Sequence, residues 1–177
     1  YLGPQALDLL ADAIKLMAAL TSINCLANKF GEDDLATLLT AIEGTSIRSL
    51  CGLTEGQTTA DFSKQNLGPI DCKIIAAEFG FRGFFGAVEA VAIGGNPITS
   101  AGGATLLETI KTSKLKTIDI GKPLPLQEPY ESDTLDLSKT GMDPGHIVIL
   151  SWWLATDAAG ALTEVNVAFN QIGSDGG

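Results

Sequence analysis

The residues best suited to chemistry in this sequence are one histidine and three cysteines among 177 residues. A histidine can act as a general base or bind a metal, and a cysteine thiolate is a nucleophile when a neighbouring base activates it. Such sites need a second histidine or closely spaced cysteines. His146 is the only histidine, and no C-x-x-C spacing joins Cys25, Cys51 and Cys72. We therefore expect no catalytic residue, no metal site and no cofactor.

The surroundings of these residues favour structural interpretations. The glycine-rich stretch "GGNPITSAGG" at 94–103 lacks the G-x-x-x-x-G-K-[ST] order of a phosphate-binding loop, and its first part is typical of a turn between a strand and a helix. His146 falls at the start of a predicted helix, where we expect an exposed side chain. The Asp and Glu residues are scattered over solvent positions. Enzymatic activity is not expected.

Composition restricts the class of protein and of partner. Apolar residues make up 45% and charged residues 18% of the chain, which indicates one folded domain over 1–177 with an unusually small share of surface charge. The net charge of −10 opposes binding to phosphate backbones, so nucleic acid is not an expected partner. A surface sparing in charge favours contact with protein partners.

The chain shows no sign of a membrane span. No uninterrupted apolar run reaches the 18 or so residues that a bilayer requires. The odd number of cysteines and the lack of an N-x-[ST] sequon favour reduced thiols and an intracellular location, in the cytoplasm or an organelle. Because the sequence begins at Tyr1 and ends in "GSDGG", we expect it to be a segment of a longer protein.

Three phrases repeat one pattern along the chain. The pattern is apolar-x-x-apolar-x-apolar-x-x-Asn-x-apolar, and it occurs as "LTSINCLANKF" (20–30), "VEAVAIGGNPI" (88–98) and "LTEVNVAFNQI" (162–172). Two further phrases begin the same way, "IRSLCG" at Ile47 and "LKTIDI" at Leu115, each 27 residues after the start of a full phrase. Alternation with a period near two predicts a short strand at each phrase.

Between these phrases the apolar spacing becomes helical. Positions i, i+3, i+4 and i+7 are apolar or small in several segments, which is typical of a helix with one buried face. This spacing predicts the core faces Leu7, Leu10, Ala11 and Ile14; Leu35, Leu38, Leu39 and Ile42; Cys72, Ile75, Ala76 and Phe79; Gly103, Leu106, Leu107 and Ile110; and Ile147, Leu150, Ser151 and Leu154. Each unit is a strand, a turn and a helix.

The repeated unit resembles the leucine-rich repeat family, and its length resembles the ribonuclease-inhibitor-like class. The resemblance covers nearly the whole chain and implies an α/β fold, a right-handed solenoid with a parallel β-sheet on the concave face and α-helices on the convex face. Two of the repeats carry irregular inserts. The family spans many roles, so the resemblance does not fix a function.

The asparagine of each full phrase has a structural role in that family. Its side-chain amide satisfies main-chain groups where the chain leaves the strand, and successive amides form a ladder. The resemblance implies this role for Asn28, Asn96 and Asn170. In the two irregular units Gln65 and Thr140 hold the same place, where we expect a weaker or water-filled ladder.

A second repeated segment occurs in the irregular units. "DFSKQNLGP" at 61–69 returns as "DLSKTGMDP" at 136–144, and each copy follows a strand phrase that has already begun. Either the extra chain is a loop from one strand, or the echo is a further strand of its own. We favour a separate strand near 134–138, with the prolines at 123, 125 and 129 in an extended outer segment, and leave 59–63 open. Pro69 and Pro144 suit the first turn of a helix.

The register predicts which side chains point outward from the sheet. One column holds Arg48, Glu89 and Lys116, whose alternating charges can neutralise one another, and a second holds Asn24, Cys51, Ala92, Asp119 and Asn166. Such columns either only solubilise the sheet or bind a partner. The candidate concave contact residues are Arg48, Glu89, Lys116, Asp119, Glu164 and Asn166.

The helix "GHIVILSWWLA" is apolar nearly all round, which is typical of a covered helix. The candidate convex contact residues are Val148, Ile149, Trp152 and Trp153, together with Phe81, Phe84 and Phe85. Two explanations compete. The segment 121–133 folds back over the tryptophans, or the tryptophans dock against another subunit.

Taken together, these patterns favour a non-enzymatic protein-interaction module or scaffold. The alternative is a structural or accessory subunit of a larger assembly, including one peripheral to a membrane, since exposed end repeats need capping to stay soluble.

Overall fold

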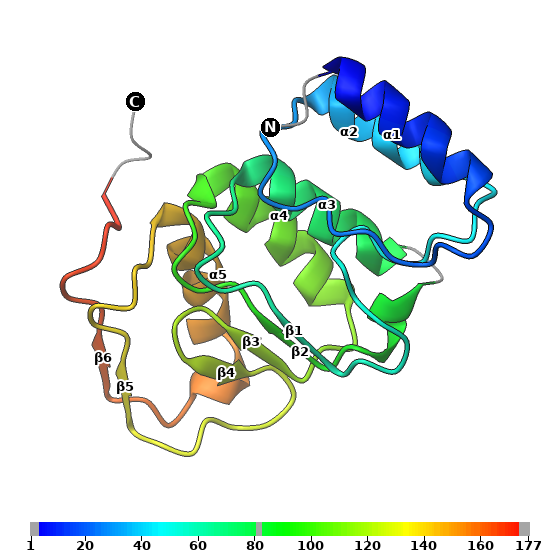
Figure 1. Cartoon of the computed structure of the whole chain (residues 1–177). Coiled ribbons are helices and arrows are strands. Elements are labelled where there is room, and N and C mark those ends of the chain that lie inside the picture. The colour runs from blue at the N-terminus through cyan, green and yellow to red at the C-terminus, as the bar shows by residue number, and fades with distance from the viewer. Residues whose placement is uncertain (1–3, 81–82, 174–177) are drawn as a thin grey trace.

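The computed structural model describes residues 4–80 and 83–173. The α-helices are α1 (Pro4–Leu16), α2 (Glu32–Ile42), α3 (Pro69–Gly80), α4 (Thr99–Thr112) and α5 (Pro144–Leu154), and the short 3-10 helices are η1 (Phe84–Ala87) and η2 (Asp157–Ala159). The strands are β1 (Thr59–Asp61), β2 (Ala90–Ala92), β3 (Thr117–Asp119), β4 (Pro123–Pro125), β5 (Thr134–Asp136) and β6 (Glu164–Asn166). The five α-helices lie along one side of the molecule and the strands along the other (Figure 1).

The strands form two small sheets. The first has the order β1-β2-β3-β4, in which β1, β2 and β3 run parallel and β4 pairs antiparallel with β3. The second consists of β5 and β6, which run parallel. Central strand residues such as Ala60, Val91 and Ile118 are buried beneath the helices. The chain is thus a mixed α/β fold with a small parallel sheet.

The strand predictions are confirmed in most places and corrected in others. Strands form within the phrases that start at 88, 115 and 162, and the favoured separate strand near 134–138 is β5. The echo near 59–63 is also a strand, β1, which pairs in register with β2. The phrases at 20 and 47 form only isolated bridges, Ser22 with Ser49 and Asn24 with Cys51. The proline segment 123–125 is not an outer segment, because as β4 it extends the sheet.

The turn after each strand phrase has a recurring backbone geometry. In five turns the residue immediately before the asparagine position has a positive φ between 55° and 71°, and these residues are Ala27, Lys64, Gly95, Lys139 and Phe169. A left-handed residue costs free energy unless it is glycine, so a non-glycine residue adopts it only where surrounding contacts compensate. The recurrence indicates that these contacts recur as well.

Two asparagine side chains supply those contacts. Asn96 Nδ2 donates to Ile93 O in its own turn and to Phe62 O in the preceding one, while Asn96 Oδ1 accepts from the amides of Gln65 and Leu67.

Asn170 acts in the same way. It donates to Val167 O in its own turn and to Leu137 O in the preceding one, and it accepts from the amides of Thr140 and Met142. Asn28 donates only within its own turn among the described residues, to Cys25 O and Leu26 O.

The predicted helix face of α4 is confirmed, since Gly103, Leu106, Leu107 and Ile110 are buried. In α1 the predicted Leu7, Ala11 and Ile14 are buried and Leu10 is partly buried. In α2 the predicted Leu35 and Leu38 are buried, but Leu39 and Ile42 are only partly so. In α3 the predicted Cys72 and Ile75 are buried, Ala76 and Phe79 are only partly buried, and Asp71, Ile74 and Glu78 are buried as well. In α5 the buried face lies one residue earlier than predicted, with His146, Ile149 and Trp153 buried beside the predicted Leu150. Both helices begin at the expected proline.

The helices pack tightly on either side of α4 and loosely between α2 and α3. A Cβ atom on Gly102 would lie 2.9 Å from Cys72 Sγ of α3, and one on Gly103 would lie 2.3 Å from Gly145 O of α5. Only glycine permits such close approach. No comparable contact joins α2 to α3 in the described part of the chain, and Figure 1 shows α1 and α2 as a pair set apart from the other helices.

Candidate interaction surfaces

Within residues 4–80 and 83–173, five polar side chains are buried, and all of them hydrogen-bond to main-chain groups. They are Ser49, Asp71, Glu78, Asn96 and His146. Among the described residues, no buried side-chain nitrogen or oxygen lacks a hydrogen-bond partner. A buried polar group costs free energy unless it is hydrogen-bonded, so these contacts are a structural requirement.

His146 is fully buried, which corrects the expectation of an exposed side chain. Its Nδ1 lies 2.7 Å from Asp143 Oδ1 and its Nε2 lies 3.2 Å from Ile93 O in the turn after β2. Burial alone would raise the pKa of the Asp143 carboxyl, but hydrogen bonds from His146 and the Thr99 amide hold that pKa below its usual value. The pair therefore fastens the start of α5 to the unit of β2 and α4.

Asp71, in the first turn of α3, makes corresponding hydrogen bonds to the main chain. Its Oδ1 accepts from the Ala27 amide at 2.8 Å, and its Oδ2 accepts from the Gly68 amide at 2.8 Å. Gln65 and Thr140 make no hydrogen bond to the preceding asparagine-bearing turn among the described residues. Asp71 makes that contact in place of Gln65, and Asp143 and His146 make it in place of Thr140. The expected water-filled gaps in the ladder are filled by polar side chains from the helix starts.

Glu78 joins α3 to the bridged segment around Ser49. Its Oε1 accepts from the amides of Leu50 and Cys51, the latter at 2.6 Å, and both carboxylate oxygens lie within 3.1 Å of Ser49 Oγ. Burial raises the pKa of Glu78 above its usual value even though these hydrogen bonds lower it. Sequence reasoning placed Glu78 off the core face. The available signal was a carboxylate seven positions after Asp71 on the same helix face.

The three cysteines are free thiols in buried positions. Burial, followed by the nearby Glu78 carboxylate, raises the pKa of Cys25 to about 11, and burial raises the pKa of Cys72 to about 12. Burial also raises the pKa of Cys51 well above its usual value. Since the thiolate is the reactive form, this burial disfavours nucleophilic reactivity of all three side chains at neutral pH.

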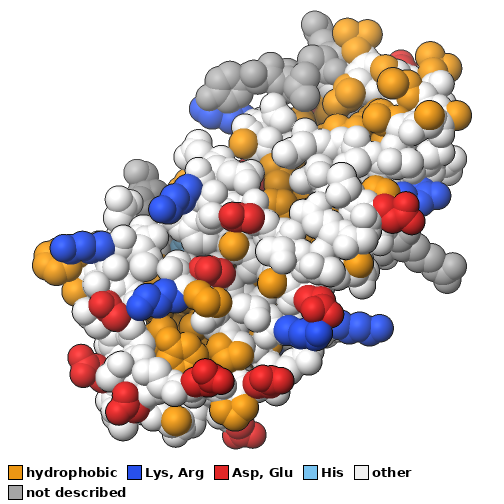
Figure 2. Space-filling view, turned by 60° about the horizontal axis from the view of Figure 1, so that its bottom comes forward, with side chains coloured by type: hydrophobic (Ala, Val, Ile, Leu, Met, Phe, Trp, Pro, Cys, Tyr) orange, Lys and Arg blue, Asp and Glu red, His pale blue; other side chains and the backbone are white. Residues whose placement is uncertain are grey.

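The predicted charge column on the strand side is formed in part. Lys116 Nζ lies 2.7 Å from Glu89 Oε1, so these two exposed residues neutralise each other. The Arg48 guanidinium instead donates to the main-chain oxygens of Thr45 and Ile47. Figure 2 brings the strand side forward and shows acidic and basic side chains across this face, with hydrophobic side chains among acidic ones in its lower part.

Polar residues of the second predicted column form hydrogen bonds to the main chain at the strand ends. Asp119 Oδ1 accepts from the Gly121 amide at 2.7 Å, and Asn166 Oδ1 accepts from the Ala168 amide at 3.0 Å. Asp61 and Asp136 make the same contact two residues on, at 2.9 Å each. These side chains close their turns but keep partial exposure. Cys51 does not belong to an outward column, because it is buried beside Glu78.

A polar hollow of about 320 Å³ lies where the strand ends meet the turns. Its lining carries both charges and consists of Asp61, Ser63, Lys64, Ala92, Gly94, Asp119, Gly121, Lys139 and Thr140. Glu164, on the outermost strand β6, is exposed. The strand side therefore offers paired charges and short polar groups, which suit hydrogen bonds and ion pairs with a protein surface.

The residues proposed for the convex surface fall into two groups, one fully buried and one partly buried. Trp153 and Ile149 are fully buried. Trp153 Nε1 donates to Pro125 O at 2.7 Å and its ring meets Tyr130 edge-on with centroids 5.7 Å apart, so the segment 121–133 covers this side chain.

The other residues proposed for the convex surface are less exposed to solvent than expected. Val148 and Trp152 are partly buried, and Phe84 packs partly buried beside the buried Phe85. Phe81 lies outside the described residues. The one-residue shift of the α5 face explains why Trp153 lies inward.

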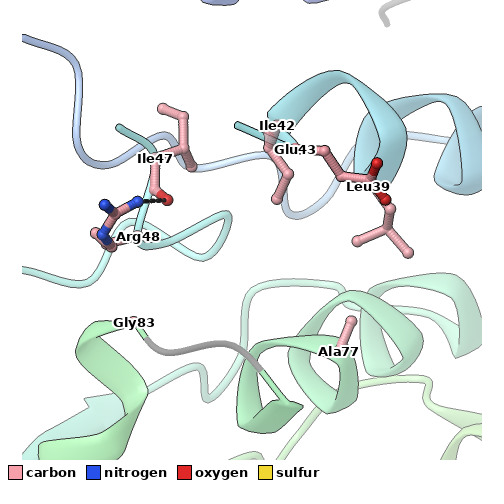
Figure 3. A pocket seen from close by; sticks show the side chains of 7 residues that line it. All are labelled: Leu39, Ile42, Glu43, Ile47, Arg48, Ala77 and Gly83. Atoms are coloured by element: carbon pink, nitrogen blue, oxygen red, sulfur yellow. Dashed lines mark hydrogen bonds between the residues drawn. The ribbon is translucent and has the colours of Figure 1, made fainter. Parts of the chain in front are cut away.

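An apolar pocket of about 430 Å³ separates α2 from α3. Figure 3 shows Leu39, Ile42 and Glu43 of the α2 end on one side and Ala77 of α3 on the other, and Ile47, Arg48 and Gly83 complete the lining. Leu39 and Ile42 were predicted to be core residues. They remain partly exposed because the small side chain of Ala77 does not reach them.

No helix in the described part of the chain is both long and apolar enough to cross a bilayer. The described residues also contain no group of three or more His, Cys, Asp or Glu side chains placed to hold a metal ion. No protein-family model matches the chain, and no curated protein matches it significantly.

Proposed function

We propose that this chain is a leucine-rich-repeat-type solenoid module that binds a protein partner and has no catalytic role. The observation that carries the proposal is the hydrogen-bond pattern that Asn96 and Asn170 share. Each bridges its own turn to the turn of the preceding unit with the same pattern of donors and acceptors. A recurring bridge of this kind supports a stack of like units, whose extended surfaces are typical protein-binding sites.

The disposition of polar groups supports binding over catalysis. The buried histidine and carboxylates are engaged by main-chain groups, and the thiols are shielded. On the strand side, Glu89 and Lys116 form a solvent-exposed ion pair. Partner contacts here would include Arg48, Asp119, Glu164 and Asn166, and the net charge of −10 favours a partner with basic side chains.

Two matched charge swaps test this surface. The double variant Glu89→Lys/Lys116→Glu keeps the ion pair on the strand side but reverses the pattern that a partner meets. The control is Glu108→Lys/Lys111→Glu, which does the same to an exposed ion pair on the helix side. The wild-type chain and both variants are immobilised, and the proteins retained from an extract of the native source are identified by mass spectrometry.

We expect proteins bound by the wild type to be lost with the strand-side swap and kept with the helix-side swap. Equal melting temperatures of the three chains exclude unfolding as the cause. Retention of every bound protein by the strand-side variant would show that this face is not the binding surface.

A structural or accessory subunit of a larger assembly is the second candidate, including an assembly at a membrane surface. It is favoured by exposed apolar side chains at α1, where Leu9 and Leu16 are exposed by 73% and 85% and Met17, just after the helix, by 53%. Size-exclusion chromatography separates the candidates, since a chain that stays monomeric and soluble alone is not an obligate subunit.

A further inference from the structure

The polar hollow on the strand side lies where four strands end. Its lining comes from the last residues of β1, β2 and β3 and from the turns after β1, β2, β3 and β5. In open parallel α/β sheets, ligands bind outside the carboxyl ends of the strands, where the strand order changes. That change falls here, because the antiparallel β4 follows β3 and ends the first sheet before β5 and β6. The position of the hollow therefore suits a binding site.

Two glycines let the turns around the hollow approach one another. A Cβ atom on Gly94 would lie 2.7 Å from Gly121 N, and one on Gly121 would lie 2.5 Å from Thr140 Cβ. Only glycine permits such contacts. The close approach sets the separation of these strand ends, so the charged side chains at the hollow stand at defined distances from one another.

Strand register places two carboxylates in one row across the sheet. Asp61 of β1 pairs with Ala92 of β2, which pairs with Asp119 of β3. Since neighbouring strands are about 4.8 Å apart, the two aspartates stand about 10 Å apart with only a methyl group between them. One oxygen of each accepts from a turn amide, of Ser63 and Gly121 respectively. The second oxygen of each accepts no hydrogen bond from residues 4–80 and 83–173, so both remain open to a ligand.

A guanidinium group fits the space between these carboxylates. It is flat and carries five N–H donors in a fixed fork, so it can donate to oxygens on two sides at once, whereas an ammonium is a compact point charge. The small Ala92 leaves room for a flat group above β2. Hydrogen bonds from the Ser63 hydroxyl and amide hold the pKa of Asp61 below its usual value, so this carboxyl is charged at neutral pH. The row thus favours an arginine side chain.

Two lysines balance the charge of this row. Lys64 and Lys139 hold the same place in their turns, and both line the hollow. A Cβ atom on Gly95 would lie 2.9 Å from Lys64 Cγ, so the stem of Lys64 lies against that glycine. Lys139 Nζ lies 5.1 Å from the centre of the Phe169 ring, whereas Lys64 forms no ion pair with a described residue. A well-matched ligand therefore brings a negative group close to its positive one.

We propose that the hollow binds an arginine side chain of the protein partner together with an acidic side chain two residues away in the same extended segment. The guanidinium lies over Ala92 and donates to Asp61 and Asp119, and the acidic group pairs with Lys64. Side chains at i and i+2 of an extended segment point to the same side, so one segment can supply both groups. The inference rests on the proposed function, since it assigns a partner segment to the strand side of a protein-binding module.

Titration of the isotope-labelled 177-residue chain with blocked tripeptides tests this site, with the amide signals of Gly94 and Gly121 as the nuclear magnetic resonance readout. The probes are acetyl-Arg-Gly-Glu-amide and acetyl-Glu-Gly-Arg-amide, which present the two charges in both orders. In one set of control peptides citrulline, an uncharged analogue of similar shape, replaces arginine. In a second set glutamine replaces glutamate.

Matched variants locate the contact. Asp61→Asn and Asp119→Asn each remove one charge and keep an oxygen for the turn amide. Their control is Asp136→Asn, because Asp136 makes the same turn contact outside the hollow. Ala92→Leu fills the space between the carboxylates without a change of charge, and its control is Ala90→Leu, one row away on the same face. Melting temperatures confirm that each variant is folded.

We expect at least one of the two probes to give saturable shifts, and each control peptide to bind at least about tenfold more weakly. The three variants in the hollow should weaken the probe by at least about tenfold, and the two control variants by less than about twofold. Equal binding of either control peptide overturns the inference, as does the lack of saturable shifts up to about 10 mM probe. If the strand-side charge swap still abolishes protein binding in that case, the proposed function stands without this contact.

Discussion

Glu78 connects two parts of the chain that no strand pairing joins. The segment at 48–52 pairs with 21–25, whereas β1 pairs with β2. Between these two sets, the Glu78 carboxylate occupies the main-chain donors of Leu50 and Cys51. A single buried side chain thus replaces part of a strand pairing, and its charge state affects the stability of the whole fold.

The free energy of unfolding should carry a pH dependence that belongs to Glu78. Because folding raises the pKa of this carboxyl above its usual value of 4.5, its stabilising contribution is complete below that value and is lost as the pH rises through the folded-state pKa. Glu78→Gln removes the titration and keeps an acceptor oxygen. Urea unfolding of both chains from about pH 4 to about pH 8 measures the difference in free energy of unfolding, wild type minus Glu78→Gln.

We expect that difference to fall as the pH rises. Asp71 and Asp143 titrate equally in both chains, so their effects cancel in the comparison. Parallel stability curves would show that the Glu78 carboxyl has the same pKa in the folded and unfolded states.

The asparagines should differ in their effect on stability. Asn96→Ala removes contacts to two units and leaves buried main-chain groups of both without partners, which should cost about 3 kcal/mol. Asn28→Ala removes contacts within one turn and should cost about 1 kcal/mol. Guanidinium unfolding measures both values. Equal losses would contradict the bridging role of Asn96.

At the scale of elements, the junction between α2 and α3 is the weakest in the row of helices. The partly exposed Leu39 and Ile42 lack an apolar partner across the pocket, because α3 presents only Ala77 there. The corresponding junctions of α4 are closed by glycines that let the backbones approach. The pocket therefore has room for a larger side chain on α3.

Ala77→Leu should stabilise the fold by about 1 kcal/mol, since the added carbons bury apolar surface in the pocket and leucine costs little helix propensity relative to alanine. Differential scanning calorimetry measures this as a higher melting temperature. The matched control is Ala104→Leu on the exposed side of α4, where no pocket exists to receive the side chain among the described residues and little change is expected. A lower melting temperature for Ala77→Leu alone would show that α2 and α3 cannot accept the extra volume.

The sequence predicts most elements but not the rotation of two of them. Apolar spacing identifies α1 and α4, and the recurring phrases identify β2, β3 and β6. It misplaces the buried face of α5 by one residue and misses part of the buried face of α3, because counting apolar residues passes over Asp71 and His146. These polar side chains turn inward to reach main-chain groups of other units. A pattern of hydrophobicity does not contain such long-range hydrogen bonds.

The candidate surface is less predictable than the fold. The pairing of Glu89 with Lys116 follows from strand register and is confirmed. The cover over Trp153 depends on where the segment 121–133 returns, and both explanations were open in the sequence. The position of Pro125 O against the indole decides it.

At the scale of the whole molecule, the part containing α1 and α2 shares one hydrophobic core with the rest of the chain, but few polar contacts join it to α3, α4 and α5. These include the contacts of Glu78, the hydrogen bond from the Ala27 amide to Asp71, and an exposed ion pair between Lys73 and Glu32. Exposed ion pairs contribute little to stability. The part at 4–53 should therefore open without unfolding of α3, α4 and α5.

Hydrogen exchange measured by mass spectrometry should detect this opening. We expect main-chain amides of α1 and α2 to exchange at least about tenfold faster than those of α4, and Glu78→Ala to widen the difference. Ser138→Ala, at a strand-side turn far along the chain from α1 and α2, is the control and should leave their exchange rates unchanged. Equal protection of α2 and α4 in the wild type would indicate one cooperative unit.

The helix-borne polar side chains that fill the ladder gaps also limit how this chain can change in length. Asp71 contacts the turn that carries Asn28, and Asp143 contacts the main chain just after Asn96, each across 44 residues. Units that bear asparagine thus alternate with units that bear a buried aspartate or histidine. Removing one unit would bring two units of a kind together and leave a turn without its acceptor. Insertion or deletion by pairs of units preserves every buried hydrogen bond, so the pair is the natural step for duplication and for engineering.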